Sequence, residues 1–479
     1  MSNYYLIVDQ GGHNTRALVF NAAGEAVADA RCDVATQCPA DGFVEQDPAE
    51  MVTSLRTVCD GIARQLGNDV SKIVSAALVT QRSSLVCWDK TSGEALTPVL
   101  SWQDVRAEDS QELAALEAEE LTITTGLRPS PHYGASKIRW CLDNVPEVQQ
   151  ALLEERLVCG PMACFLLYHL NGGQQLAVDP ANASRTLLWN IRLGDWDSKL
   201  LEHFGIPAQV LPPLKPSLSD YGELDIGEIK VPIQLLNGDQ CAAFYGRGGM
   251  QEGTVYINAG TGAFIATPWP EDKFPPSNLL KTLVLDDGNT RSFVAEGTVN
   301  GAGSALDWAA KQLQLNGLGE LDNWCQSEMS PPLFLNGVGG LGAPFWRSQF
   351  RSEFIGGVSA ASRMVAVLES IVFLLKINLD LLHSGDTELT HIVLGGGVGS
   401  SSYFCQKLSS LSGLPVFRPK EVELTSRGAA YLLAGQPEGW HQQRGQKFEP
   451  RSDRGLEERY RHWRTAIAER IDDDGLFRS

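Results

Sequence analysis

The sequence lacks the short patterns that mark several common binding sites. No GxxxxGK[ST] stretch occurs in its 479 residues, so a P-loop nucleotide site is excluded. Its ten cysteines include no CxxC pair, and its eight histidines include no HExxH spacing. We therefore expect no tightly held transition metal, and the scattered cysteines are typical of reduced, mostly buried thiols.

Positive charge is also in short supply. The chain has 39 Lys and Arg residues against 58 Asp and Glu residues, which gives a net charge of -19. Nucleic acid is therefore not an expected partner, because phosphate backbones are bound through surplus Lys and Arg. ATP is not excluded, since a local site and a metal ion can override the global field.

Long apolar runs are absent as well. The most apolar helix candidate, residues 157–170, is interrupted by Gly160 and Pro161 and is too short to cross a bilayer. The N-terminal stretch MSNYYLIVDQGG lacks the basic region and apolar stretch of a signal peptide. We therefore expect a cytoplasmic protein with no role in the membrane.

What the sequence has is a globular composition, with 43% hydrophobic residues and enough length for two or more domains. Residues 4–9 and 16–32 predict three strands joined by turns. Residues 254–269 repeat the plan with a strand, a small-residue turn and a returning strand. The repeat predicts a duplicated α/β architecture with a boundary in the glycine-rich stretch GRGGMQEG. We place the domains at 1–248 and 249–479.

Helical patterns lie between these strands. Residues 47–66 open with an Asp cap followed by Pro, which predicts a helix start. Residues 362–383 are apolar almost all round, which predicts a buried helix, and residues 391–397 predict a buried strand that ends in a glycine turn. From residue 450 the charged tail predicts one terminal helix with a frayed DDDG end.

A glycine turn follows the first predicted strand in DQGGHNTR. The backbone N–H groups of Gly11 and Gly12 and the side chain of Arg16 suit phosphate oxygens, and Asp9 is placed to hold Mg²⁺ through water. Taken alone, this turn is more simply a plain hairpin with a surface Arg.

Two further small-residue turns follow strands, at 258–262 and 395–402. Together the three turns suit a nucleotide held between two lobes, with two turns at the phosphates and the third under adenine. Ordinary loop glycine is the alternative. A GxGxxG match at 337–342 lacks the acid expected about 20 residues later in a dinucleotide site. We interpret it as a connection where the backbone passes close to another element.

Asp239 follows an apolar run and precedes a segment that predicts the start of a helix, in LLNGDQCAAF. A carboxylate at the end of a strand suits the acceptance of a proton from a substrate hydroxyl in an interlobe cleft. Helix N-capping is the alternative, because Asp is a favoured cap residue. A carboxylate tied up by capping is a poorer base, and both interpretations stay open on Asp239 alone.

An ordered series of motifs covers nearly the whole chain: DQGGHNTR, GFVEQDPAEM, TQRSSLVCWDKTSG, WQDVRA, NASRTLLWNIRLGDWDSKLLEHFGIP, NGDQCAAF, GTGAF, GLGAPFW and GGGVGSSSYF. In these motifs and their order the sequence resembles the FGGY carbohydrate kinases and, within them, is most similar to the glycerol kinases. The series is far more specific than any single motif.

The resemblance implies a two-lobed fold of the actin and hexokinase type, a duplicated ribonuclease H-like architecture with a cleft between the lobes. The lobes would close over ATP and Mg²⁺ and move the γ-phosphoryl group to a substrate hydroxyl, with Asp239 as general base. Such an enzyme works mostly by positioning and charge neutralisation.

The residues implied at the substrate are Arg82, Ser83, Trp102, His132, Asp239 and Gln240. Those implied at ATP are Gly11, Gly12, His13, Asn14, Arg16, Gly260, Thr261, Gly303, Asp307, Gly396, Gly397 and Ser400. Those implied at the metal are Asp9 and Asp239.

Three positions depart from the family pattern. Glycerol kinases carry Glu after the substrate Arg, where this sequence has Ser83, and Tyr in a PYF segment, where it has His132 in PHY. Losing a carboxylate removes a strong hydroxyl acceptor and leaves space, which favours a longer polyol or a ketose over glycerol. In an alternative interpretation, Tyr133 takes the place of the missing tyrosine. A purely structural role for His132 is as well supported as a contact with the substrate. His13 replaces a small hydroxyl residue in the phosphate turn, where it either touches the γ-phosphate or faces solvent.

The sequence thus predicts an ATP-dependent kinase that phosphorylates a primary hydroxyl of a small neutral polyol or ketose. The alternative is a catalytically weak, nucleotide-dependent regulatory protein that binds a sugar on the same fold. Asp239, Arg16 and Thr261 are all present, which speaks against that alternative. The resemblance further implies a homodimer or a homotetramer, without selecting one.

Overall fold

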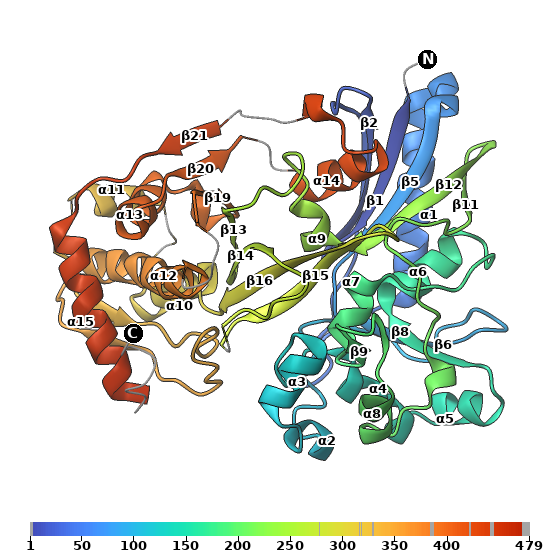
Figure 1. Cartoon of the computed structure of the whole chain (residues 1–479), viewed down its shortest axis with the longest axis horizontal. Coiled ribbons are helices and arrows are strands. Elements are labelled where there is room, and N and C mark those ends of the chain that lie inside the picture. The colour runs from blue at the N-terminus through green and yellow to red at the C-terminus, as the bar shows by residue number, and fades with distance from the viewer. Residues whose placement is uncertain are drawn as a thin grey trace. The chain divides into compact units, whose positions relative to one another are not determined.

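The computed structural model describes residues 3–276, 278–315, 317, 319–327, 330–383, 388–420, 423–440 and 445–471. The chain has mixed α/β structure and divides into two compact units (Figure 1). The first unit comprises Met1–Met250, Lys281–Phe293 and Glu423–Gln442, and the second comprises Gln251–Leu280, Val294–Val422 and Gln443–Ser479. The chain therefore returns to the first unit twice. The domain limits placed at residues 248 and 249 stay a prediction.

The first unit is built on a six-stranded sheet with the order β11-β12-β5-β1-β2-β3. Its strands are β1 (Tyr4–Gln10), β2 (Asn14–Asn21), β3 (Ala26–Asp33), β5 (Ile73–Thr80), β11 (Glu223–Ile226) and β12 (Ile229–Gly238). β1 pairs antiparallel with β2 and parallel with β5, and β5 pairs parallel with β12. The three strands predicted at the start of the chain are confirmed.

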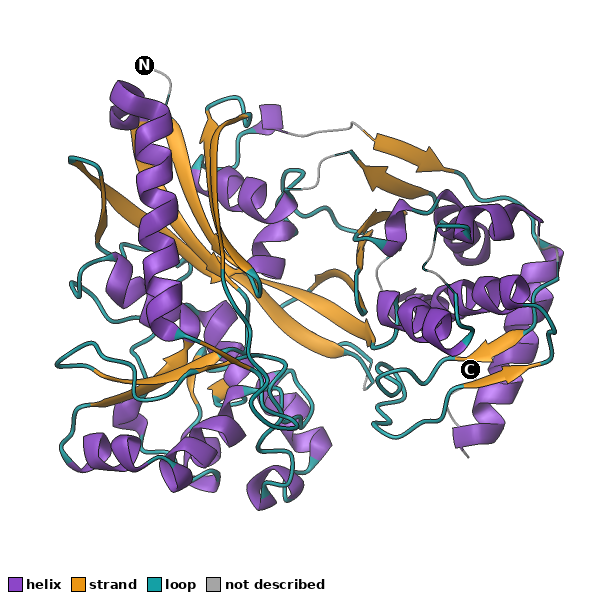
Figure 2. Ribbon diagram, turned by 180° about the vertical axis from the view of Figure 1, so that it is seen from behind, coloured by secondary structure: helices purple, strands orange, loops and turns teal. Residues whose placement is uncertain are grey.

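Helices cover both faces of this sheet (Figures 1 and 2). On one face α1 (Pro48–Leu66) packs against β2 and β3. On the other face α14 (Leu424–Leu433) packs against β1 and β5, and α9 (Asp239–Ala243) packs against α14. The start of α1 is as predicted, because Asp47 Oδ1 accepts a hydrogen bond from the Ala49 N–H at 2.8 Å.

A second, four-stranded sheet with the order β4-β7-β6-β8 belongs to the same unit. Its strands are β4 (Glu45–Gln46), β6 (Leu85–Asp89), β7 (Val99–Leu100) and β8 (Leu157–Pro161), and α6 (Met162–Leu170) follows β8 directly. Residues 157–170 were expected to be an interrupted helix, and the expectation is wrong for the first part, which pairs with β6 along its whole length. The break at Gly160 and Pro161 is therefore a change from strand to helix.

Further elements of this unit are short helices and two short strands. They are α2 (Gln111–Ala114), α3 (Ala118–Thr125), α4 (Gly134–Asn144), α5 (Pro146–Leu153), α7 (Pro180–Ala183), α8 (Ser198–His203), β9 (Trp189–Asn190), β10 (Asp195–Trp196) and the 3-10 helices Gly67–Lys72, Ser184–Thr186, Ala208–Val210 and Glu438–Trp440.

The second unit repeats the sheet plan of the first. β13 (Thr254–Ala259) pairs antiparallel with β14 (Ala263–Trp269) and parallel with β19 (His391–Gly395), and β19 pairs parallel with β20 (Val416–Pro419). In this sheet β14, β13, β19, β20 and β21 are neighbours in that order. The predicted strand, turn and returning strand of residues 254–269 and the duplicated α/β architecture are confirmed.

The other elements after residue 270 are both strands and helices. They are β15 (Leu280–Asp286), β16 (Arg291–Val299), β17 (Leu333–Leu335), β18 (Glu353–Ile355), β21 (Gly445–Phe448), α10 (Gly303–Gln312), α11 (Leu321–Ser327), α12 (Ala360–His383), α13 (Ser402–Ser412), α15 (Arg454–Ile471) and the 3-10 helix Val398–Ser400. α15 confirms the predicted terminal helix, whereas its predicted frayed DDDG end lies outside the described residues.

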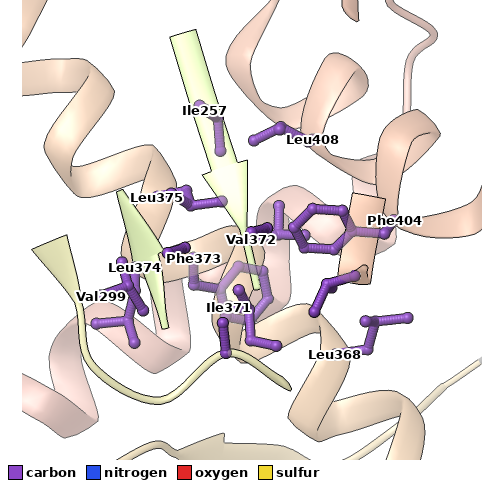
Figure 3. Packing of buried hydrophobic residues seen from close by; sticks show 14 of the residues in the cluster. Ile257, Val299, Leu368, Ile371, Val372, Phe373, Leu374, Leu375, Phe404 and Leu408 are labelled. Carbon is purple, nitrogen blue, oxygen red and sulfur yellow. The ribbon is translucent and has the colours of Figure 1, made fainter. Parts of the chain in front are cut away.

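The core of the second unit is organised around α12, which is buried on almost all of its faces, as its composition predicts. Figure 3 shows Ile371 and Phe373 of this helix among Phe404 and Leu408 of α13 and Ile257 of β13. Burying one such side chain contributes roughly 1.5–3 kcal/mol, so this helix supplies a large share of the packing in its unit.

Several smaller expectations are also answered. The glycines at 337–342 form a close backbone connection, since a Cβ on Gly342 would lie 2.4 Å from the Thr298 carbonyl oxygen. All ten cysteines are free thiols, and eight of them are buried. Within the described ranges, no helix combines the length and apolar character needed to cross a membrane.

Candidate active site

Three parallel strands of the first unit end at the same level of its sheet. The last residues of β1 and β12 both lie opposite Thr80, the last residue of β5. The residues that follow these strands, Gly11, Gln81 and Asp239, therefore leave the sheet at one edge. Ligands of parallel sheets bind at the carboxyl ends of the strands. This edge brings together the predicted phosphate turn and the predicted general base.

The phosphate turn between β1 and β2 is held by local hydrogen bonds. The Gly11 N–H donates to the Asn14 carbonyl at 3.0 Å, so it closes the turn. The Gly12 carbonyl accepts hydrogen bonds from Gln46 Nε2 at 2.6 Å and from Thr36 Oγ1 at 3.1 Å. Of the two N–H groups predicted to meet phosphate, that of Gly12 makes no hydrogen bond within the described part of the chain.

His13 lies at the tip of this turn with its side chain exposed. Its carbonyl accepts a hydrogen bond from the Val34 N–H at 2.9 Å, which ties the turn to the end of β3. The two roles considered for the imidazole, a contact with the γ-phosphate and a solvent-facing position, both stay predictions.

Charged side chains meet beneath the turn. Asp9 and Arg16 lie opposite each other on β1 and β2. The Arg16 guanidinium forms ion pairs with Glu423, just before α14, and with Asp29 at 3.0 Å. Arg16, which the sequence places at the phosphates, is thus engaged by two carboxylates here. Sequence reasoning missed Glu423 because 407 positions separate it from Arg16.

The balance of charges around Asp9 leaves it easily protonated. Its pKa is raised from 3.8 to about 7, chiefly by burial and next by the negative charge of Asp239. The Arg16 charge opposes this shift, Glu423 adds to it, and the hydroxyl of Ser426 on α14 lowers it. Asp9 is therefore about half protonated near neutral pH, and a divalent cation would favour its ionised form.

Asp9 and Asp239 have the right chemistry for the predicted Mg²⁺ site. This ion prefers oxygen ligands and is commonly held by one or two carboxylates together with waters and phosphate oxygens. Across the residues that the structure describes, no group of three or more His, Cys, Asp or Glu side chains is placed to hold a metal ion. The two carboxylates therefore fit Mg²⁺ only as part of a shared site with water or a nucleotide.

Asp239 is the first residue of α9, and Gly238 occupies the N-cap position. The alternative interpretation of Asp239 as the capping residue is therefore wrong. Its Oδ1 accepts a hydrogen bond from the Gln240 N–H at 2.6 Å, and its Oδ2 accepts none from the described residues. Burial raises the pKa of Asp239 above its ordinary value, whereas the Arg82 charge and the backbone hydrogen bonds lower it.

Arg82 lies against the start of α9. Its Nη2 donates to Gln240 Oε1 at 3.1 Å, and its Nη1 lies 3.3 Å from Cys241 Sγ. A Cβ on Gly238 would lie 2.4 Å from Arg82 Cδ, so the glycine leaves room for this side chain. The predicted substrate residues Arg82 and Gln240 are thus brought together beside Asp239.

The next predicted substrate residues, Ser83, Trp102 and His132, are held by a strained backbone at the first and by hydrogen bonds at the other two. Ser83 has a φ of 65°, in the left-handed region that non-glycine residues seldom adopt. The Trp102 N–H donates to Ser84 Oγ at 3.0 Å, and the Trp102 carbonyl accepts a hydrogen bond from His132 Nδ1 at 3.0 Å. The Trp102 backbone is therefore fixed on both sides, while its side chain is 42% exposed.

The contact with Trp102 determines which form of His132 is present. A carbonyl oxygen only accepts, so Nδ1 carries the proton and the neutral ring presents Nε2 as an acceptor. Partial burial lowers the pKa of His132 below its ordinary value, and the hydrogen bond to Trp102 opposes this shift. His132 is therefore mostly neutral near pH 7 and offers an acceptor nitrogen.

Lys137 on α4 supports the same segment, and sequence reasoning missed it. Its Nζ donates to the Ser101 carbonyl at 2.7 Å, immediately before Trp102. Burial lowers the pKa of Lys137 to about 7, and the Asp104 carboxylate opposes this shift. Lysine is seldom fully buried. The only signal in the sequence is a lysine on the apolar face of the helix that begins at Gly134.

The predicted nucleotide residues of the second unit form a group of their own. The Gly303 N–H donates to the Gly260 carbonyl at 2.8 Å, and the Ser304 N–H donates to the Thr261 carbonyl at 3.0 Å. A Cβ on Gly303 would lie 2.7 Å from the Gly260 oxygen. The turn after β13 therefore rests directly on the start of α10.

Gly396 and Gly397 follow β19, the parallel neighbour of β13. A Cβ on Gly396 would lie 2.4 Å from the Ala259 carbonyl oxygen, whereas a Cβ on Gly397 would meet no atom within 4 Å. Ser400 Oγ donates to the Gly397 carbonyl at 2.6 Å. Asp307, on α10, is exposed. The structure thus places the predicted glycine turns of this unit at the ends of two adjacent strands.

Comparison with known proteins agrees with this arrangement. The chain matches the N-terminal domain of the FGGY family of carbohydrate kinases over residues 4–246 and its C-terminal domain over residues 255–435. A glycerol kinase from Xanthobacter autotrophicus is 32% identical over 98% of this chain and 99% of its own. Glycerol kinase 1 from Pseudomonas aeruginosa is 33% identical over 92% of this chain and 91% of its own.

Solved structures give the same result. Plasmodium falciparum glycerol kinase with ADP has a TM-score of 0.89 and 25% identity, over 98% of both chains. A xylulose kinase from Rhodospirillum rubrum shares the fold, with a TM-score of 0.85 and 20% identity over 98% of this chain and 99% of that one. The chain therefore belongs to the FGGY family of carbohydrate kinases and is a phosphotransferase with an alcohol group as acceptor.

Proposed function

We propose that the chain uses ATP and Mg²⁺ to phosphorylate a primary hydroxyl of a small neutral polyol or ketose. The observation that carries this proposal is the position of Asp239. Its partly buried carboxylate, with a raised pKa, lies beside Arg82 and Gln240 at the sheet edge that also carries the phosphate turn. The use of a nucleotide is supported by the similarity to a glycerol kinase whose structure was solved with ADP.

In this proposal Asp239 is the general base. Its Oδ2 accepts the proton of the substrate hydroxyl as that oxygen attacks the γ-phosphorus of ATP, and ADP leaves. A base is most efficient when its pKa is close to the working pH, and burial moves Asp239 in that direction. Arg82 and Gln240 hold neighbouring hydroxyl groups so that the attacking oxygen is in line.

The phosphate side involves the first turn and its charged neighbours. The Gly12 N–H meets a phosphate oxygen, and Arg16 exchanges part of its contact with Glu423 for a phosphate. Bound Mg²⁺ neutralises phosphate charge, and Asp9 and Asp239 are the carboxylates that fit it. The ATP residues proposed in the second unit are Gly260, Thr261, Gly303, Asp307, Gly396, Gly397 and Ser400.

The acceptor is proposed to be longer than glycerol. Ser83 presents a short hydroxyl where the glycerol kinases that the sequence resembles have a carboxylate. His132 Nε2 supplies an acceptor nitrogen near Trp102, in place of a tyrosine hydroxyl. An acceptor with more carbons, such as a tetritol, a pentitol or a ketose, fills the space that the missing carboxylate leaves.

A coupled ADP-release assay over glycerol, tetritols, pentitols, pentuloses and hexuloses tests this proposal. We expect one of the longer acceptors to give kcat/KM at least tenfold above that of glycerol. Glycerol as the clear winner would contradict the roles given to Ser83 and His132. No release of ADP with any acceptor would contradict the proposed reaction itself.

No observation favours the regulatory alternative. The proposed base and the phosphate residues Arg16 and Thr261 are all present, and the family match covers both domains. A cytoplasmic location, expected from the N-terminal stretch and the lack of long apolar runs, stays a prediction. So does the homodimer or homotetramer that the family resemblance implies.

A further inference from the structure

Two buried glutamines connect the phosphate turn to the substrate side of the site. Gln46 on β4 is 2% exposed, and Gln81, directly after β5, is 5% exposed. Gln46 Nε2 donates to the Gly12 carbonyl at 2.6 Å, and Gln81 Nε2 donates to Gln46 Oε1 at 2.8 Å. Neither residue belongs to the predicted site.

The direction of this chain of hydrogen bonds is fixed at one end. The Gly12 carbonyl only accepts, so Gln46 must present its NH₂ group there and its oxygen to the other amide. Gln81 must then present its own NH₂ group to that oxygen, and the same group lies 3.8 Å from Met162 Sδ. Both amides are therefore held in a single orientation.

This orientation leaves one polar atom unpaired. Gln81 Oε1 is buried and has no hydrogen-bond partner among the described residues. It faces the phosphate turn, because a Cβ on Gly12 would lie 3.6 Å from it. Leaving a buried acceptor unpaired destabilises a fold, and apolar side chains of similar size would avoid that cost. A buried amide whose oxygen has no partner in such a place indicates a role beyond packing.

Backbone and side-chain hydrogen bonds of Gln81 and Arg82 also link the phosphate turn to the substrate side of the site. The Gln81 N–H donates to the Gln10 carbonyl at 2.9 Å, one residue before the phosphate turn. The next residue, Arg82, contacts Gln240 beside the proposed base. A shift of the Gln81 amide would therefore move the turn and the acceptor residues together.

We propose that Gln46 and Gln81 form a polarised amide relay that positions the Gly12 turn for the phosphates of the nucleotide. The two glutamines are positioning residues, since they act through the turn and not on the reacting atoms. This proposal rests on the proposed function, in that the turn binds phosphate.

Two substitutions at Gln46 separate the relay from simple packing. In Gln46→Met the donor to Gly12 is lost without adding charge, so the ADP dissociation constant should rise about tenfold, the size of one buried hydrogen bond, equally at pH 6 and pH 8.5. In Gln46→Glu the ionised carboxylate accepts from Gln81 but donates nothing to Gly12. Burial favours the protonated, neutral form of this new carboxyl group, and its O–H donates a hydrogen bond to the Gly12 carbonyl. ADP binding by this variant should therefore recover towards the parent at pH 6.

The controls use the same chemistry elsewhere. Gln149 lies exposed on α5, and its Nε2 also donates to a backbone carbonyl, that of Leu142 on α4, at 3.0 Å. Gln149→Glu should bind ADP like the parent at both pH values. The Gln46 amide contacts Gly12, Thr36 and Gln81, none of which titrates between pH 6 and 8.5. Asp9 titrates nearby, so every profile is compared with that of the parent.

The outcomes distinguish this proposal from the proposed function. The measurement is calorimetric binding of MgADP to the full chain, with thermal unfolding as a check that each variant folds. Parent-like ADP binding by a folded Gln46→Met would overturn the relay, and so would a flat Gln46→Glu profile. If the parent binds ADP but phosphorylates no acceptor, the proposed reaction fails and the relay is still tested by binding. A parent that binds no ADP would overturn both.

Discussion

At the residue scale, Asp9 is a site group whose charge state changes near neutral pH. Its raised pKa, about 7, means that the folded protein without ligands holds a proton that the unfolded chain releases near 3.8. Below pH 3.8 both states are protonated and the group contributes nothing to stability. Between pH 3.8 and 7 the folded state binds more protons, so the free energy of unfolding falls as pH rises, and the loss is complete above pH 7.

Asp9→Asn removes this penalty. We expect the free energy of unfolding of the ligand-free variant to exceed that of the parent by roughly 1–3 kcal/mol at pH 8. A pKa shift is equivalent to about 1.4 kcal/mol per unit, and solvent screening reduces this value. The difference should vanish towards pH 4. Urea unfolding at pH 4, 6 and 8 measures it, with the exposed Asp225→Asn as a control. Parallel pH profiles for Asp9→Asn and the parent would contradict the assigned charge balance.

Ser83 carries the argument about acceptor length. Ser83→Glu restores a carboxylate acceptor and fills space, so we expect kcat/KM for glycerol to rise about tenfold relative to that for the best longer acceptor. The measurement is the ratio of the two kcat/KM values by ADP release. An unchanged ratio in a variant with the parent's unfolding temperature would show that Ser83 does not line the acceptor site.

The same scale shows what a sequence can and cannot reveal about a site. Asp239 is recognisable because it stands at the end of an apolar run, and Arg82 because the motif TQRSSLVCWDKTSG takes part in the family resemblance. Glu423 is not, because its contact with Arg16 depends on the chain returning to the first unit after 407 positions. Gln81 is equally hidden, since burial and hydrogen-bond direction exist only in three dimensions.

At the element scale, α14 supports the helix that carries the proposed base. The two helices touch through backbone, because a Cβ on Gly428 would lie 1.9 Å from the Ala242 carbonyl oxygen. Arg427 on α14 donates to the carbonyls of Gly246, just after α9, and Trp440, the second at 2.8 Å. The position of Asp239 therefore depends on a helix close to the C-terminal end of the chain.

Gly428→Ala should push α9 and α14 apart. We expect a loss of about 1–3 kcal/mol in the free energy of unfolding and at least a tenfold loss in kcat, because the start of α9 moves. Chemical unfolding and steady-state kinetics measure both. Gly439→Ala is the matched control, since a Cβ there meets nothing within 4 Å. A fully active Gly428→Ala variant would show that α14 does not hold α9 in place.

Elements with clear periodicity were predictable, and β8 shows where prediction fails. α1 and α12 have a cap signal or a long apolar pattern, and both are helices close to the predicted limits. Residues 157–161 are apolar without a period, so sequence alone does not separate a buried strand from a helix. Pairing with β6, about 70 positions away, decides in favour of the strand.

At the scale of the whole molecule, the repeat of the sheet plan is the main predictable feature. Each half of the sequence opens with a strand, a glycine turn and a returning strand, and in each unit the first strand also pairs with a parallel neighbour. The return of Lys281–Phe293 and Glu423–Gln442 to the first unit was not predictable. It depends on long-range packing that leaves no local pattern.

The most direct test of the proposed reaction is the turnover of Asp239→Asn with MgATP and the best acceptor, measured by coupled ADP release. Asparagine keeps the shape of the side chain and cannot accept the proton, so kcat should fall roughly 10²- to 10⁴-fold. The variant should stay folded, with an unfolding temperature no lower than those of the parent and of Asp225→Asn. A folded Asp239→Asn variant that keeps more than about a tenth of the parental kcat would contradict the account.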